Sequence, residues 1–424
     1  MSGSSSSNKN SATTLLNIVK SYRASDVLEF TAKRKVADDS REGILHNLNA
    51  SSGSSQSRPE AEGEDDDKNG HRGGEGRPSS VIVVDSTMTP LEAATLLWEN
   101  NIMGAPVYDA TTKTFVGMFD VRDILSCVTA AHREYLELGG PNAIVAVGKH
   151  HTSGEDIHQA NDATYLETHR KIQGELLAKA IQRLKISTKP STPGAVTVSY
   201  LAARNPVDQT YSKDTLLLDI CKGLTSRHMH RVPITDSSSG TPVCIGIISQ
   251  SGLVAFLASK CPHGSLDETM IDAGLSFRKD VVQVAESETA FTTFELLDSK
   301  RLSGIAVVDE DGKLIGNTSA VDIKNAVMDA GRTVMDMDIL SYLACVRQSQ
   351  VMKNCKVPNC HVREDATVGN VVNLLAKTGF HRVFVVDDGM KPVGVISFTD
   401  IIQFFVKSEM DENDVEGNAG DPNS

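Results

Sequence analysis

One structural pattern recurs four times along the chain, and this repetition limits the folds that the chain can adopt. The copies span residues 80–128, 203–260, 278–330 and 350–407 of the 424 residues. In each copy a short apolar segment and a segment with helical spacing are followed by two strand-like segments and a second helix. A unit of this size cannot bury a sheet face alone, so neighbouring copies must pack together. We therefore predict an α/β fold in which four β-α-β-β-α repeats pair into two modules.

Local signals support these elements. Residues 89–92 (TPLE) form a capping box with proline at the first helical position. Ser287 and Asp365 stand where we expect the N-caps of the matching helices in the third and fourth repeats. The turns 309–313 (DEDGK) and 387–391 (DDGMK) are predicted hairpin connections, in which glycine supplies the positive φ angle.

Three segments lie outside the repeats. Residues 1–79 are rich in Ser, Gly and charge, and we predict that they are largely disordered apart from a short amphipathic helix around residues 15–30. The insertion at 129–202 is predicted to be partly helical. Residues 408–424 form an acidic tail that we also predict to be disordered.

The net charge of −13 is concentrated in these segments, since residues 60–77 carry −4 and residues 408–424 carry −6. The acidity therefore belongs to solvated segments and does not characterise a ligand. A nucleic-acid partner is not expected, because only 5% of the residues are aromatic and no basic stripe with interleaved aromatic residues occurs.

Other common classes of protein find little support in the sequence. No run of about 18 apolar residues and no apolar leader are present, so we expect an intracellular protein without membrane contact, cytoplasmic and with the nucleus as a second compartment. The seven cysteines favour reduced thiols. Cys355, Cys360 and His361 are too few for a zinc site, so we expect no metal. Walker, GxSxG and HExxH motifs are absent, so we do not expect an enzyme.

A Ser-x-x-Asp pattern ends the third strand and opens the second helix of two repeats. It occurs as Ser319–Asp322 and Ser397–Asp400, and the first repeat keeps the acidic residue as Asp123. A helix N-terminus presents unpaired N–H groups that suit a phosphate, and a carboxylate one turn later can accept hydrogen bonds from ribose hydroxyls. The alternative is that these residues only cap helices. Recurrence at the same place favours ligand binding.

A His-Arg pair precedes the middle strand of two repeats, as His230–Arg231 and His381–Arg382. The guanidinium group offers a fixed fork of donors for phosphate oxygens, and a neighbouring imidazole adds a donor that gains charge when phosphate is close. The alternative interpretation is a solvated basic strand end.

The repeats resemble cystathionine-β-synthase (CBS) domains through the Ser319–Asp322 and Ser397–Asp400 motifs. The phrases GAPVYD…FVGMFDVRDIL and HRVFVVDD…VGVISFTDI resemble in particular the gamma subunits of AMP-activated protein kinase. This resemblance covers 80–128 and 203–407. It implies that the two modules form a disk with one potential site per repeat, that the His-Arg pairs face phosphates in a central channel, and that the ligands are AMP, ADP or ATP. It also implies kinase alpha and beta subunits as partners.

The repeats differ in how well they keep this pattern. Asp120 replaces the expected hydroxyl residue in the first repeat, and Met103 stands where gamma subunits tend to have Arg. A carboxylate there repels a phosphate. In the second repeat Gly252 replaces the ribose-binding Asp after Ser249. The predicted nucleotide-binding residues are Asp123, His230, Arg231, Ser249, Arg301, Ser303, Ser319, Asp322, His381, Arg382, Ser397 and Asp400.

We therefore expect a non-catalytic, gamma-like regulatory subunit that senses adenine nucleotides, mainly at the third and fourth repeats. One alternative is a stand-alone CBS protein that binds adenosyl ligands and regulates another enzyme or a transporter. A second is a structural scaffold whose Ser and Asp residues act only as caps.

Overall fold

The computed structural model describes eight segments of the chain: residues 14–35, 81–137, 197–207, 211–226, 229–323, 334–351, 360–378 and 380–417. The predicted disorder at 1–10 and 50–79 lies outside the described residues. The same is true of the predicted helix in the C-terminal half of the 129–202 insertion.

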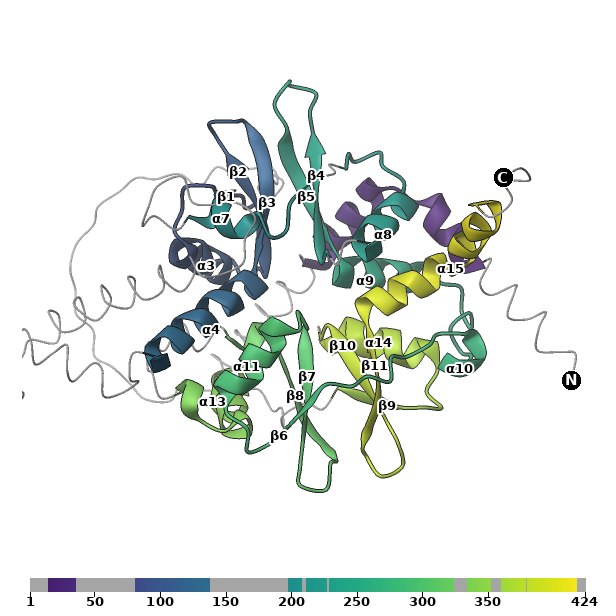
Figure 1. Ribbon diagram of the computed structural model, residues 1–424. Coiled ribbons are helices and arrows are strands. Elements are labelled where there is room, and N and C mark those ends of the chain that lie inside the picture. Colours follow the sequence, from purple (N-terminus) through teal and green to yellow (C-terminus); the bar gives the residue numbers. More distant parts are fainter. Residues whose placement is uncertain are drawn as a thin grey trace, which may run out of the picture.

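All four repeats share one order of elements (Figure 1). The first repeat contains β1 (Val84–Asp85), α3 (Pro90–Glu99), β2 (Gly104–Asp109), β3 (Thr114–Asp120) and α4 (Val121–Glu137). The second contains α8 (Leu217–Ser226), β4 (Arg231–Asp236), β5 (Val243–Ser249) and α9 (Gln250–Lys260). Its first strand is reduced to a parallel bridge between Tyr211 and Ile234.

The second half of the chain continues this order. The third repeat contains β6 (Gln283–Ala285), α11 (Ala290–Ser299), β7 (Gly304–Val308), β8 (Leu314–Ser319) and the 3₁₀ helix η1 (Ala320–Ile323). The fourth contains β9 (His361–Arg363), α14 (Val368–Thr378), β10 (Arg382–Val386), β11 (Pro392–Ser397) and α15 (Phe398–Gly417). The linkers contain α7 (Val198–Ala202), α10 (Met270–Ala273), η2 (Val334–Asp336) and α13 (Ile339–Val351). These elements confirm the predicted repeats of mixed α/β structure.

Strand register is the same in every repeat. The first residue of the middle strand lies opposite the last residue of the strand that follows it. The four pairs are Gly104–Asp120, Arg231–Ser249, Gly304–Ser319 and Arg382–Ser397. Since strand pairing fixes which side chains face one another, the predicted site residues occupy equivalent places in the four repeats.

The repeats pack around a common centre as two modules. Figure 1 shows the β2–β3 and β4–β5 hairpins side by side, and the β7–β8 and β10–β11 hairpins side by side at the opposite edge. Helices join the modules, because one apolar cluster contains residues of the first and third repeats and another contains residues of the second and fourth. The sheets of the third and fourth repeats meet in a smaller cluster that includes Ala306 and Phe384. This arrangement agrees with the predicted disk.

Two helices precede the first repeat, at residues 14–21 and 24–35. Leu15, Val19 and Val27 are buried in the apolar cluster of the second and fourth repeats. Tyr22 packs edge-on against Phe256, with ring centroids 5.1 Å apart. These helices therefore form part of the folded body.

Two predictions of helix caps were wrong. The N-cap of α11 is Thr289, whose hydroxyl accepts the N–H of Thr292, and Ser287 lies two residues earlier. At α14 the hydroxyl of Thr367 accepts the N–H of Asn370 in place of Asp365. Both helices begin later than predicted because β6 and β9 are followed by a turn before the cap. The capping box at Thr89 and Glu92 is confirmed.

One turn prediction was also wrong. Gly312 has φ +78° as predicted for the first hairpin, but in the second hairpin the positive φ (63°) belongs to Met390 and not to Gly389. In both turns the fourth residue donates its N–H to the aspartate that opens the turn, from Gly312 to Asp309 and from Met390 to Asp387. Hydrogen bonding therefore selects the position, which is occupied by glycine in the third repeat and by Met390 in the fourth.

Candidate functional site

The Ser-x-x-Asp motifs form compact turns where β8 and β11 end. The backbone N–H and the hydroxyl of Ser397 both donate to Asp400 Oδ2 at 2.6 Å. Ser319 donates to Asp322 Oδ2 in the same way, at 2.8 Å from N and 3.2 Å from Oγ. Capping and ligand binding are compatible here, since these contacts hold one oxygen of Asp400 while none of the described residues donates to Oδ1.

The corresponding turn of the second repeat differs. Without a carboxylate at position 252, Ser249 Oγ accepts the N–H of Gly252 at 3.1 Å and caps α9. Ser249 therefore behaves as a helix cap, and this repeat has no acidic group for a ribose at that position.

The His-Arg pairs of the second and fourth repeats meet at the centre. The rings of His230 and His381 stack with centroids 5.8 Å apart. Burial, and then the charges of Arg231 and Arg382, lower the pKa of His381 to about 4. This imidazole is therefore neutral near pH 7, and an arriving anion would raise its pKa.

Arg382 is a buried cation whose partner is a hydroxyl group. Its Nε donates to Ser303 Oγ at 3.1 Å. Burial, and then the charge of Arg278, lower the pKa of Arg382 to about 10. Among the described residues no carboxylate forms an ion pair with it. Such a cation is costly to bury, and an anionic ligand would offset that cost.

The first repeat carries its own carboxylates at the centre. Asp120 Oδ2 lies 3.3 Å from Arg122 Nη2 and 3.9 Å from Arg231 Nη1. The N–H of Asp120 donates to Asp123 Oδ2 at 2.9 Å. Burial, and then the charge of Asp120, raise the pKa of Asp123 to about 7. The acidic residue predicted to bind ribose therefore holds its proton more tightly than an ordinary carboxyl group.

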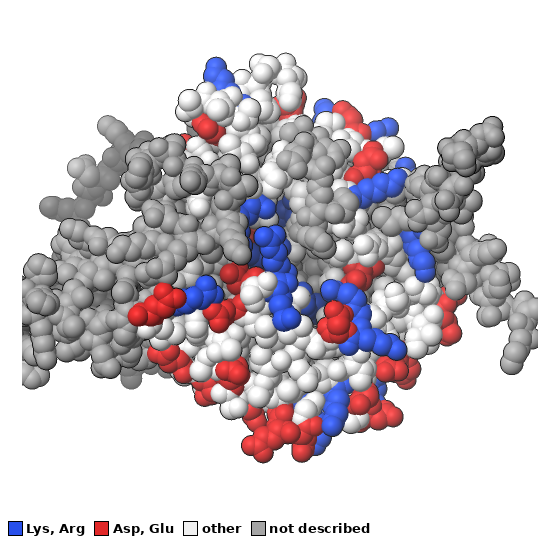
Figure 2. Space-filling view, in the orientation of Figure 1, with Lys and Arg blue, Asp and Glu red and all other residues white. Residues whose placement is uncertain are grey.

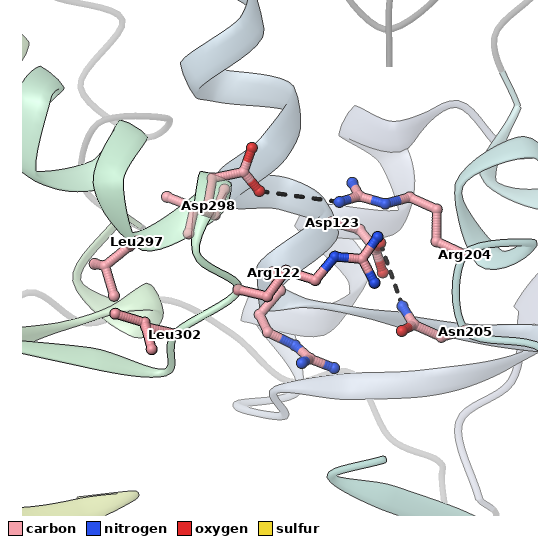
Figure 3. A pocket seen from close by; sticks show the side chains of 9 residues that line it. Arg122, Asp123, Arg204, Asn205, Leu297, Asp298 and Leu302 are labelled. Atoms are coloured by element: carbon pink, nitrogen blue, oxygen red, sulfur yellow. Dashed lines mark hydrogen bonds and ion pairs between the residues drawn. The ribbon is translucent and has the colours of Figure 1, made fainter. Parts of the chain in front are cut away.

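A pocket lies beside Asp123, between the first and third repeats (Figure 3). It is lined by Arg122, Asp123, Leu125, Arg204, Asn205, Leu297, Asp298, Arg301 and Leu302. Arg204 reaches Asp298 at 3.9 Å, and Asn205 Nδ2 donates to Asp123 Oδ1 at 3.5 Å. Arg122 Nε and Arg204 Nη1 are buried, and no described residue accepts a hydrogen bond from them. Such donors fit an anionic ligand group.

Basic side chains gather in the middle of one face. Figure 2 shows Lys and Arg side chains between the repeats at the centre of the molecule, while acidic side chains lie mainly toward the edges. The chain as a whole is acidic, so this local excess of positive charge favours an anion at the centre.

The structure thus brings the predicted residues together unequally. Five of them meet at the centre through the contacts above: His230, Arg231, His381, Arg382 and Ser303. Asp322 and Asp400 lie in the first turn of the helices that follow β8 and β11, and Asp123 and Arg301 line the pocket.

Sequence reasoning missed Arg122, Arg204, Asn205, Arg278 and Asp298. Arg278 Nη2 lies 3.7 Å from Asp400 Oδ2, and Arg278 exchanges backbone hydrogen bonds with Val395. Asn205 accepts the N–H of Met118 at the matching place in the first repeat. Arg122, next to Asp123, could have been noticed in the sequence. The others come from linkers or from another repeat, so only the topology shows their role.

The described residues contain no group of three or more His, Cys, Asp or Glu side chains arranged to hold a metal ion. Within the same residues, no helix has the length and apolar character that crossing a bilayer requires.

Replacing Arg301 by Asn is expected to stabilise the fold and weaken anion binding. Arg301 has φ 51°, and Asn101 has φ 50° at the equivalent place in the first repeat. Asn tolerates this left-handed conformation better than Arg, so the gain should be a few tenths to about 1 kcal/mol. Thermal unfolding and phosphate titration measure the two effects. The reverse change Asn101→Arg is the matched control and should lower stability; equal stability of both variants would contradict the role of backbone strain.

Comparisons with known proteins agree with this architecture. The CBS domain family matches residues 79–130, 274–329 and 350–407, which correspond to the first, third and fourth repeats. The second repeat has the same order of elements but lies outside the matched residues.

Among curated proteins, human 5'-AMP-activated protein kinase subunit gamma-3 is 26% identical over 335 residues, covering 78% of this chain and 58% of that protein. The gamma subunit of Saccharomyces cerevisiae is 21% identical and is covered to 86%, with 77% of this chain aligned. The chain spans a little over half the length of the mammalian relatives that it matches.

The fold also matches a crystal structure from Methanocaldococcus jannaschii, of a protein proposed as an archaeal homologue of the AMP-activated kinase gamma subunit. The TM-score is 0.51 at 15% identity, over 78% of this chain and 97% of that chain. At this identity the match concerns the fold alone. Three of the four repeats match the CBS domain family, and the chain is similar to the gamma subunits of AMP-activated protein kinase.

Proposed function

We propose that this chain is a non-catalytic, gamma-like regulatory subunit that binds AMP, ADP or ATP at its third and fourth repeats. The observation that carries the proposal is Arg382. It is buried at the centre with Ser303 as its hydrogen-bond partner, in the same module as the carboxylates of Asp322 and Asp400. This module combines a buried cation that has no ion-pair partner among the described residues, suited to phosphate, with oriented acceptors for ribose hydroxyls.

In this arrangement each part of a nucleotide has a complementary group. The carboxylate of Asp322 or Asp400 accepts from the ribose hydroxyls, and the phosphates extend toward Arg382 and the stacked imidazoles of His230 and His381. Apolar strand residues of the same repeat cover the adenine. The ligand acts by binding one arrangement of the two modules more tightly than another, and so passes the charge state of the nucleotide to a partner.

The proposed partners are the catalytic alpha subunit and the beta subunit of a kinase heterotrimer. The resemblance to gamma subunits supports this proposal. Purification of the tagged full-length chain from its own cells tests this. Recovery of kinase alpha and beta subunits in stoichiometric amounts is expected. Recovery of the chain alone, with adenosyl ligands still binding, would favour a stand-alone CBS regulator.

Changing Asp400 to Asn tests the ribose contact. The amide keeps the size of the side chain but loses the charge that makes it a strong acceptor, so nucleotide affinity should fall about 10- to 100-fold. Calorimetric titration with AMP measures the change. Asp365→Asn removes the same charge from an exposed position and should leave affinity unchanged. Wild-type affinity in Asp400→Asn would rule out the proposed ribose contact.

A further inference from the structure

The four repeats differ at one position that faces the centre. The last residue of the third strand is Ser249, Ser319 and Ser397 in three repeats and Asp120 in the first. All four lie opposite the first residue of the preceding strand. At this place in the strand register the first repeat therefore has a carboxylate where the other three repeats have a hydroxyl.

The carboxylate of Asp120 is held as a phosphate oxygen would be held. Oδ1 accepts the backbone N–H of Arg122 at 2.8 Å, and Oδ2 lies 3.3 Å from Arg122 Nη2 and 3.9 Å from Arg231 Nη1. The side chains of Asp120 and Arg231 are only 7% and 12% exposed. Burial of Asp120 opposes ionisation, but the charges of Arg122 and Arg231 outweigh it and hold its pKa below the ordinary value. The carboxylate is therefore a permanent anion.

The other module has Ser319 at the place of Asp120. Gly304 makes room for Arg382, because a Cβ atom on Gly304 would lie 3.2 Å from Arg382 Cδ. In the first repeat Gly104 makes room for the carboxylate side chain itself, because a Cβ atom there would lie 2.7 Å from Asp120 Cβ. Arg382 binds the hydroxyl of Ser303, whereas the equivalent residue of the first repeat is Met103, which has no hydroxyl. Arg231 thus lies 3.9 Å from a carboxylate oxygen, whereas Arg382 hydrogen-bonds to a hydroxyl group and forms no ion pair with a described carboxylate.

We propose that Asp120 is a resident anion that occupies the place of a ligand phosphate beside Arg231. The module of the first and second repeats therefore takes no phosphate at this position, and phosphate recognition at the centre belongs to Arg382. The pocket beside Asp123 offers different donor atoms, Arg122 Nε and Arg204 Nη1, and is a separate position. The inference rests on the proposed function only for the identity of the ligand that carries the phosphate.

Asp120→Ser, the residue found in the other three repeats, should turn this position into an anion site. The variant leaves Arg122 and Arg231 buried without their carboxylate, so its melting temperature should fall. Inorganic phosphate should then raise that temperature by at least about 2 °C more than it raises the wild type's. Adding Arg231→Gln should remove this extra response. An equal response in wild type and variant, or one that survives Arg231→Gln, would overturn the proposal.

The reciprocal change Ser319→Asp tests the same idea if Asp120→Ser does not fold. It places a carboxylate opposite Gly304, beside Arg382, and should abolish the phosphate response that Arg382 gives the wild type. A full phosphate response in Ser319→Asp would contradict the inference. Because both experiments use inorganic phosphate, the resident anion can be confirmed even if no adenine nucleotide binds, in which case only the proposed function fails.

Discussion

Replacing Arg382 by Gln is expected to weaken binding of AMP and ATP by about 10- to 100-fold while leaving the ligand-free protein at least as stable as the wild type. The affinity falls because the guanidinium group offers charged donors to phosphate oxygens, which an amide cannot replace. Stability is preserved because the buried charge of Arg382 is costly and has no carboxylate partner among the described residues. Calorimetric titration and thermal unfolding measure the two effects on the same sample.

Arg363→Gln is the matched control for this experiment. Arg363 is exposed and pairs with the exposed Asp388, and an exposed ion pair contributes little to stability. This variant should keep nucleotide affinity. If Arg382→Gln bound nucleotides as the wild type does, the proposed phosphate contact would be wrong; if it unfolded, Arg382 would be a structural residue.

Replacing Val19 by Asp is expected to destabilise the protein by about 3–5 kcal/mol, because a carboxylate would be buried without a partner. Val19 is 0% exposed and lies in the apolar cluster shared by the second and fourth repeats. Asn17→Asp, on the exposed side of the same helix, introduces the same charge and should have little effect. Equal stability of the two variants, measured by denaturant unfolding, would show that the helices before the first repeat are not part of the core.

Much of the fold could be predicted from the sequence because the signals are local. The repeat period, the capping box at Thr89 and the hairpin at Gly312 each depend on residues close together in the chain. The errors have the same origin. Thr289 and Thr367 cap helices that start after an unpredicted turn, and the hydrogen bonds of the second hairpin place Met390 at the positive φ.

The candidate site was predicted less completely, because its parts come from different repeats. Ser397 and Asp400 form a local motif and could be found by spacing alone. Two other contacts depend on how the repeats pack together. They are the stacking of His230 on His381 and the hydrogen bond from Arg382 to Ser303. Arg204 reaches the pocket from the start of the second repeat, whereas the other lining residues come mainly from the first and third repeats. The contacts between repeats therefore follow from three-dimensional packing and cannot be predicted from the spacing of residues in the sequence.

The two modules consequently differ in charge while sharing one fold. Asp120 pairs with basic groups in the first module, whereas Arg382 in the second hydrogen-bonds to a hydroxyl and has no ion pair among the described residues. Because the two modules share one fold but differ in charge, the module of the third and fourth repeats can bind phosphate while the module of the first and second repeats maintains the shared structure.

The central claim is that this chain binds adenine nucleotides through the module of the third and fourth repeats. Calorimetric titration of the full-length protein with AMP, ADP and ATP tests it most directly, with Arg382→Gln in parallel. We predict saturable binding of at least one of these nucleotides to the wild type and a large loss of affinity in the variant. The absence of saturable heat with all three nucleotides, at concentrations up to about 1 mM, would contradict the proposed function.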